Sequence, residues 1–273
     1  MPESLLPPLV DTETLQQHLD DPHLLIVDLR PKDDYEEGHI PGARSLDYSE
    51  IVQARPPAMG MLPDEERLGR VLSRIGLTPE HHVVAYDEEG GGRAARLLWT
   101  LEALGHRQLS LLDGGLIAWD EEERPIEEGP DRGASSDYRA QFENAGVVTD
   151  KQHILERLGA ADLALLDARS PGEFRGQDMR ARRGGHIPGA VNLNWTEVMD
   201  PEDSLRLKPN PEIQAMLKAR GVTPDKEVVV YCQTHHRSAH TYWVLRHLGY
   251  PNIKGYPGAW SEWGNDPEMP VER

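Results

Sequence analysis

The only cysteine of this 273-residue chain, Cys232, stands between an apolar run and a polar loop. Residues 228–231 are Val-Val-Val-Tyr, and the polar residues that follow lead into a helical pattern. This order places the thiol at the carboxyl end of a buried strand, where open α/β sheets bind ligands. Backbone N–H groups in such a loop lower a thiol pKa and hold an anion beside it. We therefore expect thiol chemistry at Cys232, although a lone cysteine is more often a core residue.

The absence of a second cysteine restricts that chemistry. No intramolecular disulfide, CxxC redox couple or thiolate zinc site can form. What remains is nucleophilic catalysis or a covalent sulfur adduct. We predict Cys232 as the catalytic residue, and we predict no metal site and no external cofactor. The loop residues expected to bind substrate or a sulfur adduct are Gln233, Thr234, His235, His236, Arg237 and Ser238.

Within this loop, Arg237 is the strongest candidate for contact with an anionic substrate, because a guanidinium both donates hydrogen bonds and carries positive charge. The roles of His235 and His236 stay open between direct contact and polar surface. They form a poor metal site, because side chains of adjacent residues diverge.

Outside the loop, two further residues are candidates for substrate binding. Arg182 belongs to a basic island, formed with Arg175, Arg180 and Arg183, that either steers anions to the site or is a solvated loop. Trp195 either faces the pocket or packs in the core.

Four buried-strand residues are expected to be structural instead. Asp167 and Arg169, with the counterparts Asp28 and Arg30, should form hydrogen bonds at a strand end. His39 and His186 recur in both halves of the chain, which points to a role in the fold.

The chain repeats itself once. His39-Ile-Pro-Gly-Ala43 recurs as His186-Ile-Pro-Gly-Ala190, and Gly76-Leu-Thr-Pro-Glu80 recurs as Gly221-Val-Thr-Pro-Asp225. We also pair residues 114–119 with 255–260, where a Gly and a Trp recur. The repeat predicts two similar domains, at residues 1–127 and 144–273. Residues 128–143 are the predicted linker. They overlap an acidic stretch (120–137) that we expect to be a solvated connector.

Short apolar runs alternate with helical patterns in each copy. We predict strands at 24–28, 83–86 and 109–112, and helices at 65–74 and 93–103. The second copy predicts strands at 163–167 and 228–231, and helices at 212–220 and 238–248. Gly76 and Gly221 should end the preceding helices. The fold class is therefore α/β, with two similar domains, each a mainly parallel sheet with helices on both faces.

The charge and hydropathy of the chain exclude some partners. A net charge of −18 and a pI near 5.0 argue against nucleic acid. No run approaches the roughly 18 apolar residues of a membrane helix, so no membrane partner is expected. The first residues lack the pattern of a secretory signal, and a single thiol suits the reducing cytoplasm, so we expect a cytoplasmic location.

The repeated Asp-x-Arg, Gly-His-Ile-Pro-Gly-Ala and strand-to-cysteine loop together resemble the rhodanese domain. Over nearly its full length the chain is similar to tandem-domain rhodaneses, and the Cys-Gln-Thr-His-His-Arg-Ser loop resembles the bacterial thiosulfate:cyanide type. The resemblance implies a sulfurtransferase in which Cys232 takes the outer sulfur of thiosulfate as a persulfide. Cyanide or another thiol then accepts that sulfur, and a protein acceptor is also expected.

The chain departs from this family pattern at two places. Asp87 follows Val-Ala-Tyr in the first copy where Cys232 follows Val-Val-Tyr in the second, and the first loop is one residue longer. We expect the first domain to be catalytically silent, because a carboxylate cannot accept sulfur. Glu173 stands where some family members carry a substrate-binding arginine, which leaves donor binding open.

Three alternative functions remain. A 3-mercaptopyruvate sulfurtransferase is disfavoured because the loop lacks the Cys-Gly-Ser/Ala-Gly pattern of those enzymes. A phosphatase of the related cell-cycle type needs five residues between Cys and Arg, whereas four separate Cys232 from Arg237. A non-enzymatic persulfide carrier would hold the sulfur but turn over slowly, and only an assay distinguishes it.

Overall fold

The computed structural model describes residues 4–273, which form two compact units. Unit 1 contains Pro63–Ala145 and the described residues up to Val52, together with Asp200–Leu207. Unit 2 contains Gly146–Met199 and Lys208–Arg273, together with Gln53–Leu62. Each unit thus takes one short segment from the other copy of the repeat, which the sequence pattern did not indicate.

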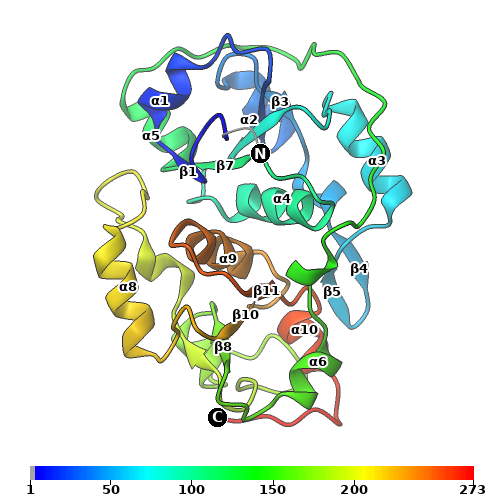
Figure 1. Ribbon diagram of the computed structural model, residues 1–273, viewed down its shortest axis with the longest axis vertical. Coiled ribbons are helices and arrows are strands. Elements are labelled where there is room, and N and C mark those ends of the chain that lie inside the picture. Colours follow the sequence, from blue (N-terminus) through cyan, green and yellow to red (C-terminus); the bar gives the residue numbers. More distant parts are fainter. Residues whose placement is uncertain (1–3) are drawn as a thin grey trace. The chain divides into compact units, whose positions relative to one another are not determined.

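Unit 1 is built on a five-stranded parallel sheet of order β1-β7-β6-β2-β3 (Figure 1). Its strands are β1 (Leu9–Val10), β2 (Leu24–Asp28), β3 (Arg44–Ser45), β6 (His82–Tyr86) and β7 (Leu109–Leu112). Its helices are α1 (Thr12–Gln17), α2 (Lys32–Glu37), α3 (Glu65–Arg74), α4 (Gly92–Ala103), α5 (Gly115–Glu121) and the 3₁₀ helix η1 (Tyr48–Ile51). Residues of α1, α2 and α5 share one buried cluster with every second residue of the central strands. Helix α4 packs against β6 and β7 from the opposite face.

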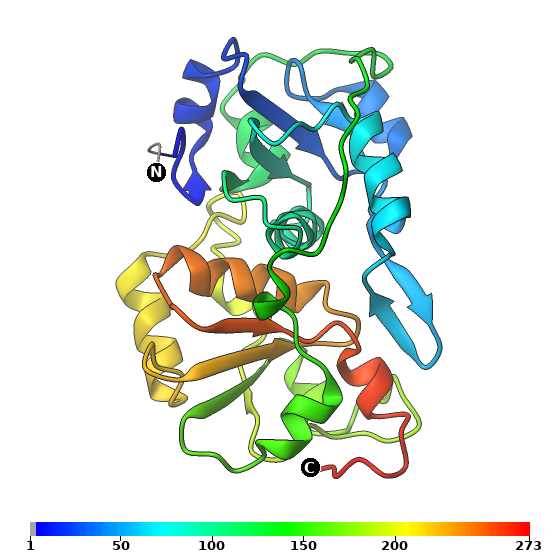
Figure 2. The ribbon, with the colours of Figure 1, turned by 45° about the vertical axis from the view of Figure 1, so that its right-hand side comes forward.

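Unit 2 contains a four-stranded parallel sheet of order β11-β10-β8-β9 (Figure 2). The strands are β8 (Leu163–Asp167), β9 (Val191–Asn192), β10 (Glu227–Tyr231) and β11 (Ile253–Gly255). The helices are α6 (Lys151–Glu156), α7 (Pro171–Phe174), α8 (Asn210–Ala219), α9 (Arg237–His247), α10 (Ala259–Trp263) and the 3₁₀ helix η3 (Trp195–Val198). A two-stranded antiparallel hairpin of β4 (Gln53–Arg55) and β5 (Ala58–Met61) packs against α10.

The buried cores explain why both faces of the unit 2 sheet are covered. Val229 and Tyr231 of β10 share a cluster with residues of α6 and α10 on one face. Helix α9 contacts β10 and β11, and Figure 2 shows it on the opposite side of the sheet from α6. The register pairs Tyr231 with Asp167, so the carboxyl ends of β10 and β8 are level.

The predicted α/β class with two similar, mainly parallel domains is confirmed. The strands predicted at 24–28, 109–112 and 163–167 and the helix predicted at 65–74 have the observed bounds, and the remaining predicted elements differ by one or two residues. Gly76 and Gly221 follow the ends of α3 and α8 with φ values of 78° and 72°, as expected for glycines that terminate helices.

The pairing of Trp119 with Trp260 is wrong. Leu116 donates its backbone N–H to the carbonyl of Asp87, and Trp260 donates to the carbonyl of Cys232, so these two positions correspond. Trp119 then corresponds to Trp263, and each indole donates to a proline carbonyl, of Pro125 and Pro270, at 2.8 Å. Because both segments contain a Gly and a Trp, the sequence alone indicated the wrong register for this part of the repeat.

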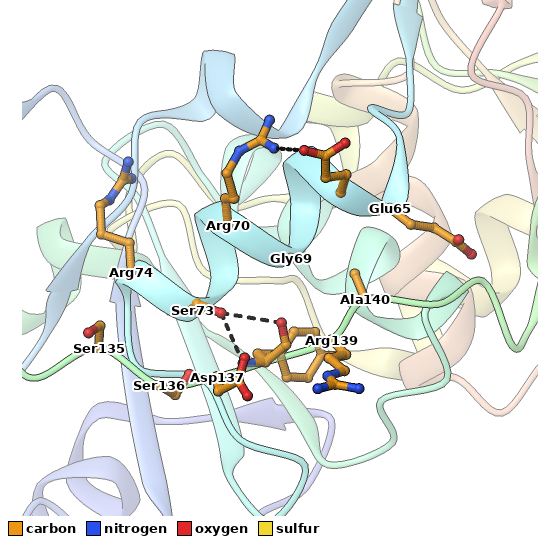
Figure 3. A pocket seen from close by; sticks show the side chains of 12 residues that line it. Glu65, Gly69, Arg70, Ser73, Arg74, Ser135, Ser136, Asp137, Arg139 and Ala140 are labelled. Carbon is orange, nitrogen blue, oxygen red and sulfur yellow. Dashed lines mark hydrogen bonds and ion pairs between the residues drawn. The ribbon is translucent and has the colours of Figure 1, made fainter.

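The acidic stretch at 120–137 is not simply a solvated connector. Asp131 accepts a 2.8 Å hydrogen bond from Arg44, whose side chain is 10% exposed and also donates to backbone carbonyls. Farther along, Tyr138 N–H donates to the Ser73 hydroxyl at 2.9 Å, and this hydroxyl donates to the Tyr138 carbonyl (Figure 3). Ser136 N–H also donates to the Ser73 carbonyl at 2.8 Å, so specific hydrogen bonds hold the segment to β3 and to α3. No helix within residues 4–273 has the length and apolar character needed to cross a membrane.

Candidate active site

Cys232 directly follows β10 and is only 1% exposed. Cys232 is therefore as buried as a core cysteine, and what separates it from one is its polar surroundings. Burial raises the pKa of the thiol, but the Arg237 charge and hydrogen bonds from the Ser238 hydroxyl and from the amides of Ser238 and Thr234 outweigh it. The net effect lowers the thiol pKa below its ordinary value. Cys232 is thus poised as a nucleophile.

The loop after Cys232 takes a conformation that turns amides toward the sulfur. His235 has a φ of 55°, in the left-handed region, and its side chain is fully buried. Its Nδ1 lies 2.7 Å from the Ser238 hydroxyl. Because this hydroxyl donates its one proton toward the thiolate, it accepts from His235, which places a proton on Nδ1. His235 therefore acts on the thiol through Ser238.

Arg237 begins α9 and is held by a carboxylate that the sequence left unassigned. Its two terminal nitrogens lie 2.6 and 2.9 Å from the two oxygens of Glu173, a bidentate pair. Glu173 is 2% exposed. Burial raises the pKa of Glu173, but hydrogen bonds and charge from Arg237 lower it to about 2. Glu173 thus fixes the position of the positive charge that acts on Cys232.

Glu173 owes its own position to a local motif. It is the third residue of α7 and closes a capping box, in which the Ser170 and Glu173 side chains each accept from the other residue's backbone N–H. The Arg180 Nε atom lies 3.4 Å from Glu173, although the Arg180 side chain is 65% exposed. The Ser170–Glu173 capping box can be read from the sequence. Arg237, the ion-pair partner of Glu173, lies 64 residues farther along the chain.

The side chain of Gln233 reaches the basic island. Its side-chain amide nitrogen donates to the Arg180 backbone carbonyl at 3.0 Å, and the backbone carbonyl of Gln233 accepts from the backbone N–H of Ser261 in α10. Arg182 is exposed, and its backbone amide donates to Asn265 Oδ1 at 2.9 Å. The basic island therefore approaches the site through Arg180, not through the predicted Arg182.

Trp195 lies beside the loop. Its ring centroid is 5.9 Å from that of His236 and 5.5 Å from that of His240. Trp195 and His236 are both partly exposed, whereas His240 is buried. The structure therefore brings Trp195 together with the predicted loop residues, next to the start of α9.

Two predicted structural pairs support the strand ends that carry these loops. Arg169 donates to both oxygens of Asp167, with Nε at 3.0 Å from each, and both side chains are buried. Arg30 and Asp28 repeat the arrangement in unit 1. The His186 ring stacks on the Phe174 ring, with 3.6 Å between the ring centroids. These contacts agree with the structural roles predicted for the repeated residues.

A second contact that the sequence did not reveal comes from the β4–β5 hairpin. A Cβ atom built on Gly60 would lie 2.0 Å from the Thr234 carbonyl oxygen and 2.8 Å from that of Pro257. Because both are backbone atoms, only glycine allows the hairpin to approach the loop this closely. The sequence showed a Gly between two Met residues, with no indication of its distant neighbour.

In the corresponding loop of unit 1, the backbone amides bind the carboxylate of Asp87, a residue of the loop itself. Asp87 is fully buried, and one carboxylate oxygen accepts from the amides of Glu89 and Gly91 at 3.0 and 2.8 Å. The other accepts from Arg93 and Ala94 at 2.9 and 3.0 Å. Burial raises the pKa of Asp87, and the amides act in the opposite direction. The Asp87 side chain thus fills the cradle of its own loop.

Comparisons with known proteins agree with this arrangement. The chain is 45% identical to a thiosulfate sulfurtransferase of Azotobacter vinelandii, over 98% of this chain and 97% of that protein. It is 43% identical to a thiosulfate sulfurtransferase of Pseudomonas aeruginosa, with the same coverage. The crystal structure of SseA from Escherichia coli, described with the 3-mercaptopyruvate sulfotransferases, matches with a TM-score of 0.83 at 32% identity, covering 93% of this chain and 99% of that one. The rhodanese-like domain family matches residues 11–122 and 150–266, so this chain belongs to that family and contains its domain twice.

Proposed function

We propose that this protein is a thiosulfate sulfurtransferase that moves sulfur through a persulfide on Cys232. The observation that carries the proposal is the thiol itself, whose pKa is lowered by Arg237 and by hydrogen bonds from Ser238 and Thr234. The two relatives at 43–45% identity that are named thiosulfate sulfurtransferase support the same donor.

In the first step, the Cys232 thiolate attacks the outer sulfur of thiosulfate. The sulfur–sulfur bond of thiosulfate breaks, its electron pair leaves with sulfite, and a new bond joins Cys232 to the transferred sulfur. The terminal sulfur of this persulfide is anionic. The amides of Thr234 and Ser238 and the Ser238 hydroxyl are the groups that stabilise it, as oxyanion-hole donors stabilise oxygen.

In the second step, cyanide or a thiolate attacks the terminal sulfur of the persulfide. The bond to Cys232 breaks, and the electron pair returns to Cys232 as the thiolate, so the cycle needs no external cofactor. With no second cysteine in the chain to resolve it, the persulfide persists until an acceptor arrives.

The remaining loop residues hold this site in shape. Arg237 supplies the positive charge for the sulfur and for an anionic donor, and Gln233 and His235 fix the loop through Arg180 and Ser238. Trp195 and His236 form one wall of the approach to the loop. Arg182, at the surface, contributes by attracting anions.

A 3-mercaptopyruvate sulfurtransferase is the second candidate, because SseA is described as one and has the same fold. The four-residue spacing between Cys232 and Arg237 continues to favour sulfur over phosphoryl transfer. A cytoplasmic location also stays a prediction from the single thiol.

The experiment that tests the proposal is the mass of the intact purified chain. Incubation with thiosulfate should add one sulfur atom, and cyanide should remove it and release thiocyanate. Cys232→Ser should neither gain the sulfur nor turn over. A Cys232→Ser protein that still made thiocyanate would refute the mechanism.

Donor preference is tested in the same assay. Thiosulfate and 3-mercaptopyruvate are compared at equal concentration through kcat/KM with cyanide as acceptor. A higher value for 3-mercaptopyruvate would replace the first candidate by the second. Slow turnover with both donors, despite a full sulfur load on Cys232, would instead identify a persulfide carrier.

A further inference from the structure

Unit 2 exposes two methionines close to the candidate site. Large exposed apolar side chains within residues 4–273 are Met59 at 44%, Ile126 at 40% and Met179 at 58% exposure. Ile126 belongs to unit 1, whereas Met59 and Met179 belong to unit 2. Flexible, polarizable methionines suit surfaces that adapt to more than one partner.

Short hydrogen bonds join the segments that carry these methionines. Met59 N–H donates to the Ser261 hydroxyl of α10 at 3.0 Å. Asn265, just beyond α10, donates to the Ser261 carbonyl at 2.8 Å and accepts from the Arg182 amide at 2.9 Å. The β4–β5 hairpin and the loop at 175–183 therefore border the same helix.

Each methionine also neighbours a residue that touches the catalytic loop. Gly60, next to Met59, lies against the Thr234 carbonyl. Arg180, next to Met179, accepts from the Gln233 side chain at its carbonyl. Each methionine is thus followed in the sequence by a residue that contacts Gln233 or Thr234, the first residues after Cys232.

The charge of the loop at 175–183 is opposite to that of the whole molecule. The loop at 175–183 carries four arginines and one aspartate, whereas the chain has a net charge of −18. Arg175, Arg180 and Arg182 are exposed, as is Arg55 on the hairpin. An acidic partner is repelled by most of the molecule and attracted here, which selects the orientation in which it docks.

We propose that Met59 and Met179, with the arginines around them, form the docking surface for an acidic protein that accepts sulfur through a cysteine thiol. This inference rests on the proposed function, because it requires the Cys232 persulfide. The partner's thiolate attacks the terminal sulfur, a new sulfur–sulfur bond forms on the partner, and the electron pair of the broken bond returns to Cys232. The partner leaves as a persulfide, and no oxidant or reductant is consumed.

The test uses the full chain loaded with sulfur by thiosulfate and freed of excess donor. Two synthetic peptides of equal length serve as acceptors, each with one cysteine and one leucine, one rich in glutamate and the other rich in lysine. Sulfur transfer is followed by the mass of each peptide, and cyanide measures the intrinsic reactivity of the persulfide. Rates are normalised to the fraction of each peptide that is thiolate, because glutamates raise the thiol pKa.

The wild-type protein should transfer sulfur about tenfold faster to the acidic peptide than to the basic one at low salt, and this preference should shrink at high salt. Met59→Asp and Met179→Asp should each slow transfer to the acidic peptide severalfold while leaving the cyanide reaction unchanged. Ile126→Asp, an equal change at an exposed apolar residue of unit 1, should alter neither rate.

Equal rates for the two peptides, or an equal loss in Ile126→Asp, would overturn the docking surface while leaving the proposed function intact. A protein that takes up no sulfur from thiosulfate, or does not release it to cyanide, would instead contradict the proposed function. The two failures are therefore distinct.

Discussion

Glu173 and Arg237 form a part-buried, bidentate ion pair, and Arg237 in turn acts on the thiol of Cys232. Both nitrogen–oxygen distances are below 3 Å, at 2.6 and 2.9 Å, and Glu173 is 2% exposed. The same Arg237 charge lowers the pKa of Cys232. Glu173 therefore determines where this positive charge lies.

Glu173→Gln should weaken the hold on Arg237 while preserving the size of the side chain. We expect Arg237 to move toward solvent, so the pKa of Cys232 rises and the acid limb of the pH–rate profile shifts to higher pH. Because a charged hydrogen-bonded pair is lost, kcat/KM for thiosulfate should fall about tenfold at neutral pH. Glu66→Gln removes the partner of Arg70 in an exposed pair of α3 and serves as the control. An unshifted profile in Glu173→Gln would show that Arg237 needs no anchor.

The Glu173 carboxylate should also make the free energy of unfolding depend on pH in the acid range. The folded-state pKa of Glu173 is lowered to about 2, whereas an unfolded glutamate titrates near 4.3. Its contribution to the free energy of unfolding is therefore complete above the unfolded pKa and is lost as pH falls toward about 2. Urea unfolding of wild type and Glu173→Gln at several pH values between about 7 and 3 measures this. The difference between the two proteins should shrink as pH falls, and a constant difference would contradict the linkage.

Ser238→Ala should act on the thiol without removing a charge. The Ser238 hydroxyl bonds to Cys232 and helps to lower its pKa, so its loss should raise that pKa. Alkylation of Cys232 by iodoacetamide, followed across pH, should then slow most at low pH, where the thiolate fraction depends on the pKa. Ser110→Ala removes an equally buried hydroxyl in unit 1, and it should leave the alkylation profile unchanged. Parallel profiles for Ser238→Ala and wild type would remove the hydroxyl from thiol activation.

The sequence predicted those parts of the fold and site that depend on local pattern. The strands before Asp28 and Asp167 follow from apolar runs, and the position of Cys232 follows from the run before it. Glu173 and Gly60 could not be predicted, because their importance lies in partners 64 and 174 residues away in the chain, at Arg237 and Thr234. Contacts between residues so far apart in the chain produce no periodic pattern in the sequence. The alignment of the two copies after Cys232 was wrong because the second copy has two tryptophans, Trp260 and Trp263, that could each be paired with Trp119.

Substitutions at Asp87 test whether the stability of unit 1 depends on the carboxylate held in this loop. Asp87→Ala leaves four amides without their acceptor, two of them buried and two part-buried, and each unsatisfied buried donor costs about 1–3 kcal/mol. We expect unit 1 to lose several kcal/mol of stability, measured by chemical denaturation. Asp87→Asn retains one oxygen acceptor and should lose less. Sulfur loading of Cys232 should persist in both variants below their unfolding transitions, because we expect the copy that contains Asp87 to be catalytically silent. A loss of loading there would contradict that expectation.

Gly60→Ala tests the support that the β4–β5 hairpin gives to the catalytic loop. The added methyl group would overlap the Thr234 carbonyl, which lies 2.0 Å from the Cβ position, so either the hairpin or the loop must shift. Because a shift of about 1 Å in catalytic geometry can cost on the order of 100-fold in rate, kcat/KM for thiosulfate should fall by at least tenfold. Gly69→Ala in α3 is the matched control, because its nearest atom is 3.4 Å away. Alanine there improves helix propensity by about 1 kcal/mol, so this control should keep full activity and unfold at a slightly higher denaturant concentration. Unchanged activity in Gly60→Ala, with the protein folded, would show that the loop keeps its shape without the hairpin.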